Sequence, residues 1–363
     1  MFTCVNAASH MMRACVVICL TYTPSYADDT DVVRELDAFI TQETERDAFS
    51  GTVLLAKGDE VIYSTARGLA SKRFGVPNNL QTKFGLGSLN KTFTAFSVMQ
   101  LVESGQIKLT DTLDQFLDET WLAHNARGQI QIQHLLTHAS GLGSYFTDAF
   151  FASSKNNFRT LADFKPLVVN DTPEFPPGTS YRYSNNGMFL LGAVIEAVTG
   201  SSYFDYIEAH IIQPAGMANT GCFEMDEPVP NLAIGYTPAP ENKSGWRTNI
   251  IIKPVKGGPA GGCYSTVEDL HRFARALTSF QFLNQLNTQM LYTPKPAFHS
   301  EPYGFGFKVA GTEHNRIVGH TGGFVGISAF MDIYLDKGYV AVALANYGGA
   351  TRPVAAKIRE LLE

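Results

Sequence analysis

A serine and a lysine stand three residues apart at the start of the apolar stretch "GLGSLNKTFTAFSVMQLVESG" (residues 85–105). If a helix begins near Ser88, Ser88 and Lys91 lie on the same helix face. Residues 89–102 are apolar on nearly all faces, which predicts a buried helix. A buried lysine has a lowered pKa, and its neutral amine can activate a neighbouring hydroxyl as a nucleophile. The pair predicts nucleophilic catalysis, and the alternative is a helix cap beside an ordinary lysine.

A phenol and a carboxamide stand two residues apart in a second segment, "PPGTSYRYSNNGMFLLGAVIE" (residues 176–196). Proline and glycine punctuation places Tyr183 and Asn185 in a loop just before a helix. Side chains two residues apart in an extended segment project to the same side, so both could face one cleft. The alternative is structural: Ser184 or Asn185 caps the helix while Tyr183 packs on the core.

A third segment, "IVGHTGGFVGISAF" (residues 317–330), ends an apolar strand with His-Thr-Gly-Gly. His320 and Thr321 precede Gly322 and Gly323, and glycines allow a substrate backbone to approach closely. Taken alone, this segment would be a turn.

These three elements, in this order, resemble the motifs of the serine β-lactamase and penicillin-binding protein superfamily. The segments "HLLTHASGL" (134–142), "PPGTSYRYSNNG" (176–187) and "GGPAGGCYSTVEDLHRFA" (257–274) look like one branch of it. That branch contains class C β-lactamases, DD-carboxypeptidases, D-aminopeptidases and esterases. The likeness runs from about Asp31 to the end of the chain.

The resemblance implies acyl transfer without a metal or cofactor. Ser88 would attack a carbonyl and Lys91 would take or relay its proton. Tyr183 would act as a partner base and as the acid for the leaving group. The sequence leaves open whether Tyr183 is partly deprotonated or Lys91 is neutral.

The resemblance also implies roles in substrate binding. Asn185 would hold the acyl amide of the substrate, and the backbone N–H groups of Ser88 and Gly323 would form an oxyanion hole. The substrate itself would be positioned by His320, Thr321 and Gly322.

One position departs from the pattern of class C β-lactamases, which have lysine where this chain has His320. Histidine has an ordinary pKa of about 6.5, so at pH 7 the anchor for a substrate carboxylate is weakened. Small esters or peptides of D-amino acids are therefore the expected substrates. A true class C β-lactamase, a penicillin-binding sensor that acylates without turnover, and a degenerate binding protein are the alternatives.

The elements that would position these residues predict an α+β fold. A helix is expected over residues 31–49 and a hairpin over 50–70, turning at Gly58-Asp59. Helical signals dominate residues 109–216, including a helix over 187–198 that ends before Gly200. A proline-punctuated loop is expected over 226–245. The last third predicts strands and a terminal helix, at residues 304–309, 327–334, 339–345 and from Pro353.

Strands at both ends with helices between predict an antiparallel sheet flanked by helices and interrupted by a mostly helical subdomain. The expected boundaries are 28–84 and 252–363 for the sheet domain and 85–251 for the helical subdomain.

The amino terminus predicts export. Residues 1–27 contain no Asp, Glu or Lys, carry an apolar run over 14–20, and end in Ser25-Tyr26-Ala27. This is the pattern of a secretory signal peptide, which indicates a periplasmic or secreted protein. A transmembrane anchor is the alternative, but the run is far shorter than the roughly 20 residues needed to span a bilayer, and no comparable run occurs later. The net charge of −6 and the lack of a basic cluster argue against nucleic acid as a partner, which leaves a small molecule or peptide.

Cysteines and histidines add little chemistry. Cys4, Cys15 and Cys19 fall in the expected signal peptide. Cys222 and Cys263 could form one disulfide or remain two buried thiols. His134 and His138 are four residues apart, as some zinc ligands are, but they lack the intervening glutamate of the zincin pattern, so no metal site is expected.

Overall fold

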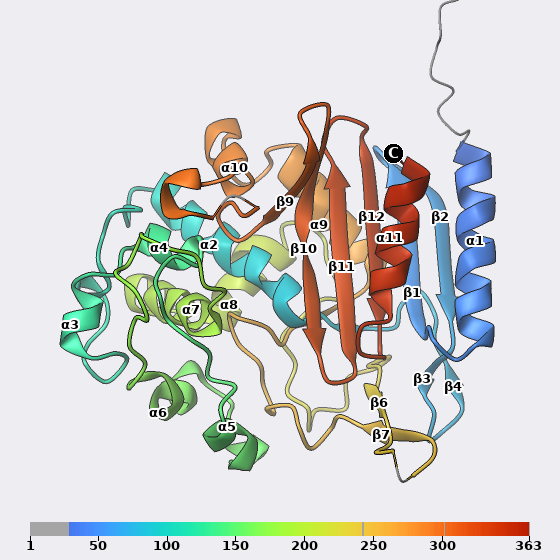
Figure 1. The fold of residues 1–363 in the computed structure, drawn as a ribbon, viewed down its shortest axis with the longest axis horizontal. Helices are drawn as coiled ribbons and strands as arrows, with labels where there is room; N and C mark the ends of the chain where they lie inside the picture. Colours follow the sequence, from blue (N-terminus) through green and yellow to red (C-terminus); the bar gives the residue numbers. More distant parts are fainter. Residues whose placement is uncertain (1–28, 242, 301, 363) are drawn as a thin grey trace, which may run out of the picture.

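The computed structural model describes residues 29–362, apart from residues 242 and 301 (Figure 1). The predicted signal peptide lies outside the described residues.

The main sheet has six antiparallel strands in the order β2-β1-β12-β11-β10-β9. Two strands come from the beginning of the chain and four from its end, which confirms the predicted antiparallel sheet flanked by helices. The strands are β1 (Gly51–Lys57), β2 (Glu60–Arg67), β3 (Leu69–Ser71), β4 (Val76–Pro77), β5 (Phe84–Gly85), β6 (Tyr236–Pro238), β7 (Trp246–Thr248), β8 (Tyr264–Ser265), β9 (Lys308–Thr312), β10 (Asn315–Phe324), β11 (Ile327–Tyr334) and β12 (Tyr339–Ala345).

Helices lie on both faces of the sheet, and most of them come from the middle of the chain (Figure 1). The predicted boundaries between a sheet domain and a helical subdomain, at residues 84 and 252, remain a proposal. The α-helices are α1 (Asp29–Glu45), α2 (Lys91–Glu103), α3 (His124–Arg127), α4 (Ile132–Leu136), α5 (Asp148–Ala152), α6 (Lys165–Val168), α7 (Asn185–Thr199), α8 (Tyr203–Ile207), α9 (Val267–Thr278), α10 (Gln285–Leu291) and α11 (Thr351–Leu362). Short 3₁₀-helices are η1 (Gly87–Asn90), η2 (Leu113–Gln115), η3 (Lys155–Asn157), η4 (Leu161–Phe164) and η6 (Pro296–Phe298), and η5 (Glu208–Ile212) is a π-helix.

Both faces of the central strands are buried, which explains why their sequences are continuously apolar. In β1, Val53 and Leu55 pack in the cluster that includes α1 and α11, while Leu54 and Ala56 pack in the larger cluster on the opposite face. This two-residue alternation follows from strand geometry. The larger cluster also contains α2, whose residues from Lys91 to Met99 are all buried. The predicted burial of this helix is confirmed.

Several predicted elements match closely and others shift. The hairpin, the α7 helix with left-handed Gly200 after it, and strands β11 and β12 lie where the sequence placed them. The first helix ends at Glu45, four residues early, and the strand expected over 304–309 is β9, which starts at Lys308.

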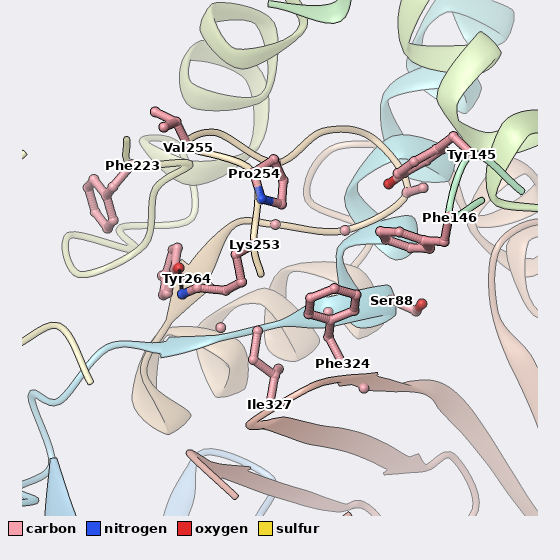
Figure 2. Close-up of a pocket in the computed structure, with 17 residues that line it drawn as sticks. Ser88, Tyr145, Phe146, Phe223, Lys253, Pro254, Val255, Tyr264, Phe324 and Ile327 are labelled. Atoms are coloured by element: carbon pink, nitrogen blue, oxygen red, sulfur yellow. Dashed lines mark hydrogen bonds between the residues drawn. The ribbon is translucent and has the colours of Figure 1, made fainter. Parts of the chain in front are cut away.

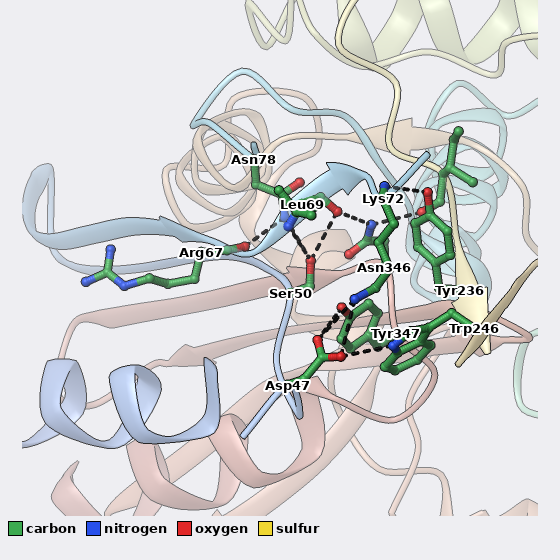
Figure 3. Close-up of polar contacts among 11 residues, drawn as sticks. Asp47, Ser50, Arg67, Leu69, Lys72, Asn78, Tyr236, Trp246, Asn346 and Tyr347 are labelled. Carbon is green, nitrogen blue, oxygen red and sulfur yellow. Dashed lines mark hydrogen bonds and ion pairs between the residues drawn. The ribbon is translucent and has the colours of Figure 1, made fainter. Parts of the chain in front are cut away.

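The segment 226–245 is not loop throughout, because β6 forms within it and pairs with β7. Asp47 holds this part of the chain against the end of the main sheet (Figure 3). Its carboxylate accepts hydrogen bonds from the Trp246 indole at 2.9 Å, the Tyr347 hydroxyl at 2.7 Å and the Lys72 ammonium at 3.2 Å. These partners come from three distant parts of the sequence, so no local pattern marks the contact.

Cys222 and Cys263 form a disulfide, which resolves the two possibilities left by the sequence. Cys263 lies next to β8, and its carbonyl accepts a hydrogen bond from the Leu86 amide at 2.9 Å, just before η1. The disulfide therefore lies close to the segment that carries Ser88.

Among the described residues, no single helix combines the length and apolar character needed to cross a membrane. Only the bent pair of Asn185–Thr199 with Tyr203–Ile212 meets both requirements together.

Candidate active site

Ser88 lies in η1, where the chain backbone packs directly on strand β10. Gly87 has φ +50°, and a Cβ atom there would lie 2.6 Å from the Gly323 nitrogen. A Cβ atom on Gly322 would lie 1.7 Å from the Leu86 carbonyl oxygen. Only glycine allows this approach. It brings Ser88 beside Gly323, the two residues predicted to form the oxyanion hole.

Ser88 and Lys91 are neighbours, as their spacing predicts, although Ser88 lies in the 3₁₀-helix η1 and the α-helix begins only at Lys91. Lys91 Nζ lies 3.0 Å from Ser88 Oγ, 2.8 Å from Asn185 Oδ1 and 2.6 Å from the Ala260 carbonyl oxygen. The Lys91 side chain has no exposed surface. A neutral amine has two N–H groups for the two carbonyl oxygens, which leaves its lone pair for the Ser88 hydroxyl proton.

The electrostatics favour a neutral Lys91. Burial lowers the pKa of Lys91 well below its ordinary value, and the nearby positive charge of Lys308 lowers it further. Burial also raises the pKa of the Tyr183 phenol, while a hydrogen bond with Ser88 opposes that rise. Of the two states left open by the sequence, these directions indicate a neutral amine beside a protonated phenol.

Tyr183 stands over the Ser88–Lys91 pair. Its ring centroid lies 4.9 Å from Lys91 Nζ and 4.3 Å from the His138 ring. His138 Nδ1 accepts a hydrogen bond from the Ser184 amide at 3.1 Å, and Ser184 caps α7 through the Gly187 amide at 2.8 Å. The cap and the histidine thus fix the backbone on which Tyr183 is carried. The cap predicted as an alternative to the active site in fact supports it.

Asn185 is the first residue of α7, whereas the sequence placed it in the preceding loop. Its Oδ1 atom accepts from Lys91, and its Nδ2 atom donates to Ser144 Oγ at 3.0 Å. Both ends of the carboxamide are therefore held at the edge of the site.

His320 to Gly323 continue strand β10 and do not form a turn. The His320 ring is 1% exposed, and its Nε2 atom lies 2.9 Å from the Tyr303 hydroxyl. Burial lowers the pKa of His320 to about 3, and the nearby positive charge of Lys308 acts in the same direction. A neutral His320 that faces Tyr303 carries no charge toward a substrate, in line with the expected weak carboxylate anchor.

Lys308 is a cation at the site that the sequence analysis missed. It is exposed at the start of β9, opposite Gly319 on β10, and its Nζ atom donates to Thr321 Oγ1 at 3.0 Å. No motif marks this lysine, because its place depends on how two strands pair. The sequence predicted a strand over 304–309 and an apolar strand that ends at His320, but not that the two strands pair.

A metal centre finds no support among residues 29–362 as described, where no group of three or more His, Cys, Asp or Glu side chains could hold an ion. His134 Nδ1 accepts from the Gln131 amide at 3.2 Å, and His138 is occupied with Ser184. These two histidines have structural contacts instead.

Comparisons with known proteins show the family to which the chain belongs. A family model described as Beta-lactamase matches residues 36–363. Penicillin-binding protein 4* of Bacillus subtilis is 30% identical over 318 residues, which cover 83% of this chain and 69% of that protein. Among solved structures, a penicillin-binding protein from Bacillus halodurans has a TM-score of 0.80 and 32% identity, covering 89% of this chain and 98% of that chain. A D-stereospecific amidohydrolase from Streptomyces sp. has a TM-score of 0.74 and 26% identity, covering 92% and 98%.

The chain spans 69% of the length of penicillin-binding protein 4* and 62% of a putative penicillin-binding protein of the same organism. The activities of those longer proteins are therefore only a basis for proposals about this chain. The family match itself covers most of the chain and supports a serine hydrolase. The resemblance seen in the three short motifs is confirmed: the chain belongs to the Beta-lactamase family, within the serine β-lactamase and penicillin-binding protein superfamily.

Proposed function

We propose that this protein is an exported serine hydrolase that forms an acyl-enzyme on an ester or amide, with Ser88 as the nucleophile. The observation that carries the proposal is the contact of the Ser88 hydroxyl with a fully buried lysine whose pKa is lowered. An amine shielded from water can accept the hydroxyl proton as the oxygen attacks. Export is proposed from residues 1–27 alone.

In the acylation step, Ser88 Oγ forms a bond to the substrate carbonyl carbon and its proton moves to Lys91. The backbone N–H groups of Ser88 and Gly323 stabilise the oxyanion. Tyr183, which is protonated, donates to the leaving group as its bond to carbon breaks, and the proton on Lys91 restores the phenol. Water then attacks the acyl-enzyme by the same proton path in reverse and releases the acid.

We propose peptides of D-amino acids with a free carboxylate, or small esters, as the substrate class. The Lys308 ammonium, which donates to Thr321 Oγ1 at 3.0 Å, could bind a substrate carboxylate on the leaving-group side. His320 is neutral and offers no charge there. A relative described as D-stereospecific agrees with this class.

A penicillin-binding sensor is the second candidate, favoured by the relatives that are described as penicillin-binding proteins. A sensor would acylate once and release almost no product. Turnover separates the two functions.

The test combines labelling with turnover. A fluorophosphonate probe should label the wild type with one adduct, located at Ser88 by peptide mass spectrometry. Ser88→Ala should abolish the label, while Ser97→Ala, which alters a buried serine of the following helix α2, should retain it. A chromogenic cephalosporin, a nitrophenyl acetate and a D-Ala-D-Ala peptide then measure turnover on the same proteins. Labelling that survives Ser88→Ala would refute the proposal, and labelling by penicillin without any turnover would favour the sensor.

A further inference from the structure

A pocket opens beside Ser88, and the residues that line it indicate which part of a substrate it would hold (Figure 2). Ser88 and Gly323, the proposed nucleophile and oxyanion-hole residue, lie on its wall. Tyr183 and Lys308, which act on the leaving group in the proposed mechanism, do not line it. Because the pocket shares the reacting centre but not the leaving-group side, it takes the acyl group.

The part of the pocket near Ser88 is aromatic and aliphatic. Phe146 and Phe324 come from distant segments, and their ring centroids lie 5.2 Å apart at the mouth. Tyr145 and Ile327 continue the wall, and both are almost fully buried. Phe146 and Phe324 are only half-buried, so their apolar faces remain available to a substrate. Surfaces of this kind bind a flat apolar group.

The far side of the pocket from Ser88 carries a positive charge (Figure 2). Lys253 is 7% exposed, and its Nζ atom donates to the Tyr264 hydroxyl at 2.6 Å. Within the described part of the chain, no carboxylate lies within 4.0 Å of this ammonium. The nearby Lys256, by contrast, pairs with Glu224 at 3.6 Å. A buried ammonium without a counter-ion is unfavourable, and an anion supplied by a ligand would relieve this cost.

We propose that the pocket selects an acyl group with an aromatic body and a terminal carboxylate, which reaches the Lys253 ammonium where the Tyr264 hydroxyl holds it; that hydroxyl donates to Met225 Sδ at 2.8 Å. The proposal rests on the acyl-enzyme function above and names the acyl side of its substrate. The aromatic body packs against the exposed sides of Phe146 and Phe324, whose rings contact each other, and the carboxylate replaces the missing counter-ion of Lys253. With Lys308 on the leaving-group side, the site would have one cation for each end of the substrate.

The test uses three nitrophenyl esters with the same leaving group and different acyl groups: acetate, phenylacetate and 4-carboxyphenylacetate. Phe324→Ala should lower kcat/KM for both aromatic esters about tenfold or more and leave acetate nearly unchanged. Lys253→Met should lower kcat/KM for 4-carboxyphenylacetate about tenfold relative to phenylacetate. Lys256→Met, which removes a cation paired with Glu224, is the matched control and should leave that ratio unchanged.

The acetate ester keeps the outcomes separate. If the wild type hydrolyses the acetate ester and Lys253→Met leaves the ratio of kcat/KM for the two aromatic esters unchanged, the carboxylate site is refuted. The proposed function would still stand. Wild type that hydrolyses none of the esters would overturn this inference, and if fluorophosphonate also fails to label Ser88, the proposed function falls with it. If Lys253→Met loses acetate hydrolysis as well, Tyr264→Phe removes only a hydroxyl and should lower the same ratio. A ratio unchanged in Tyr264→Phe as well would refute the proposal.

Discussion

Lys308 on β9 donates a hydrogen bond to the Thr321 hydroxyl on β10, and the two atoms lie 3.0 Å apart. The strands pair so that Lys308 lies opposite Gly319, one residue before His320. His320 itself faces Tyr303 and is neutral because burial lowers its pKa to about 3. The positive charge that the His-Thr-Gly motif lacks is thus present on the neighbouring strand.

Lys308→Met should therefore weaken the binding of substrates that carry a carboxylate on the leaving-group side. We expect KM for a D-Ala-D-Ala peptide to rise about tenfold or more, because a hydrogen-bonded charge pair contributes about 1.5–3 kcal/mol. Hydrolysis of neutral nitrophenyl acetate should change little. Steady-state kinetics on both substrates test this, with Lys108→Met at an exposed position as the control. An equal loss on both substrates would contradict a role in carboxylate binding.

Lys91→Met should abolish the chemistry without emptying the space that Lys91 fills. The methionine side chain is similar in size but cannot accept a proton, so kcat/KM should fall by about 10²–10⁴. Labelling of Ser88 by fluorophosphonate should slow in proportion. Lys83→Met is a fair comparison, because Lys83 is also buried and donates to the Pro230 carbonyl. Near-normal labelling of Lys91→Met would show that another group activates Ser88.

The pH dependence of the reaction should report the lowered pKa of Lys91. Activity needs the neutral amine, so kcat/KM should rise with pH through the pKa of Lys91 and become level well below 10.5. The raised pKa of Tyr183 keeps the phenol protonated past pH 10, so the activity should not fall near that pH. A kcat/KM profile between pH 5 and 10.5 tests both statements. A rate that is still rising as the pH approaches 10.5 would mean that Lys91 has an ordinary pKa.

Local sequence patterns predicted the reacting residues of the site better than they predicted the residues that surround them. The apolar run around Lys91 was enough to predict its burial, and the three-residue spacing was enough to bring it to Ser88. Lys308 and Lys253 escaped notice, because their positions depend on strand pairing and on loops that meet across long separations. His320 was identified, but only the fold shows that its ring faces Tyr303. The spacing of residues within one helix or strand can be predicted from the sequence, whereas contacts between elements depend on tertiary packing.

The disulfide between Cys222 and Cys263 should stabilise the protein in an oxidising compartment. It closes a loop with a sequence separation of 41, for which the chain-entropy model gives about 4 kcal/mol. Cys222→Ser/Cys263→Ser should lower the free energy of unfolding measured in urea, and a reducing agent should lower that of the wild type similarly. The reducing agent should have no effect on the double variant. Equal stability of the wild type and the double variant would contradict this prediction.

The buried neutral His320 should make the folded protein sensitive to acid. Its pKa is about 3 in the folded protein and about 6.5 when unfolded, so between these values the unfolded chain binds more protons. The free energy of unfolding therefore falls as the pH drops from about 6.5 toward 3, by up to about 1.4 kcal/mol per pH unit from this residue. His138, whose pKa burial also lowers, adds in the same direction.

Urea unfolding of the wild type and His320→Gln at several pH values between 7 and 4 isolates this contribution. Glutamine cannot become charged, so the variant should lose less stability per pH unit than the wild type, even if it is less stable at pH 7. His314→Gln, at an exposed position on the turn between β9 and β10, is the control and should follow the wild type. Parallel curves for the wild type and His320→Gln would mean that His320 accepts a proton as readily in the folded protein as in the unfolded chain. In that case His320 could serve as a cation toward the substrate in mild acid, and binding of the substrate carboxylate would no longer depend on Lys308.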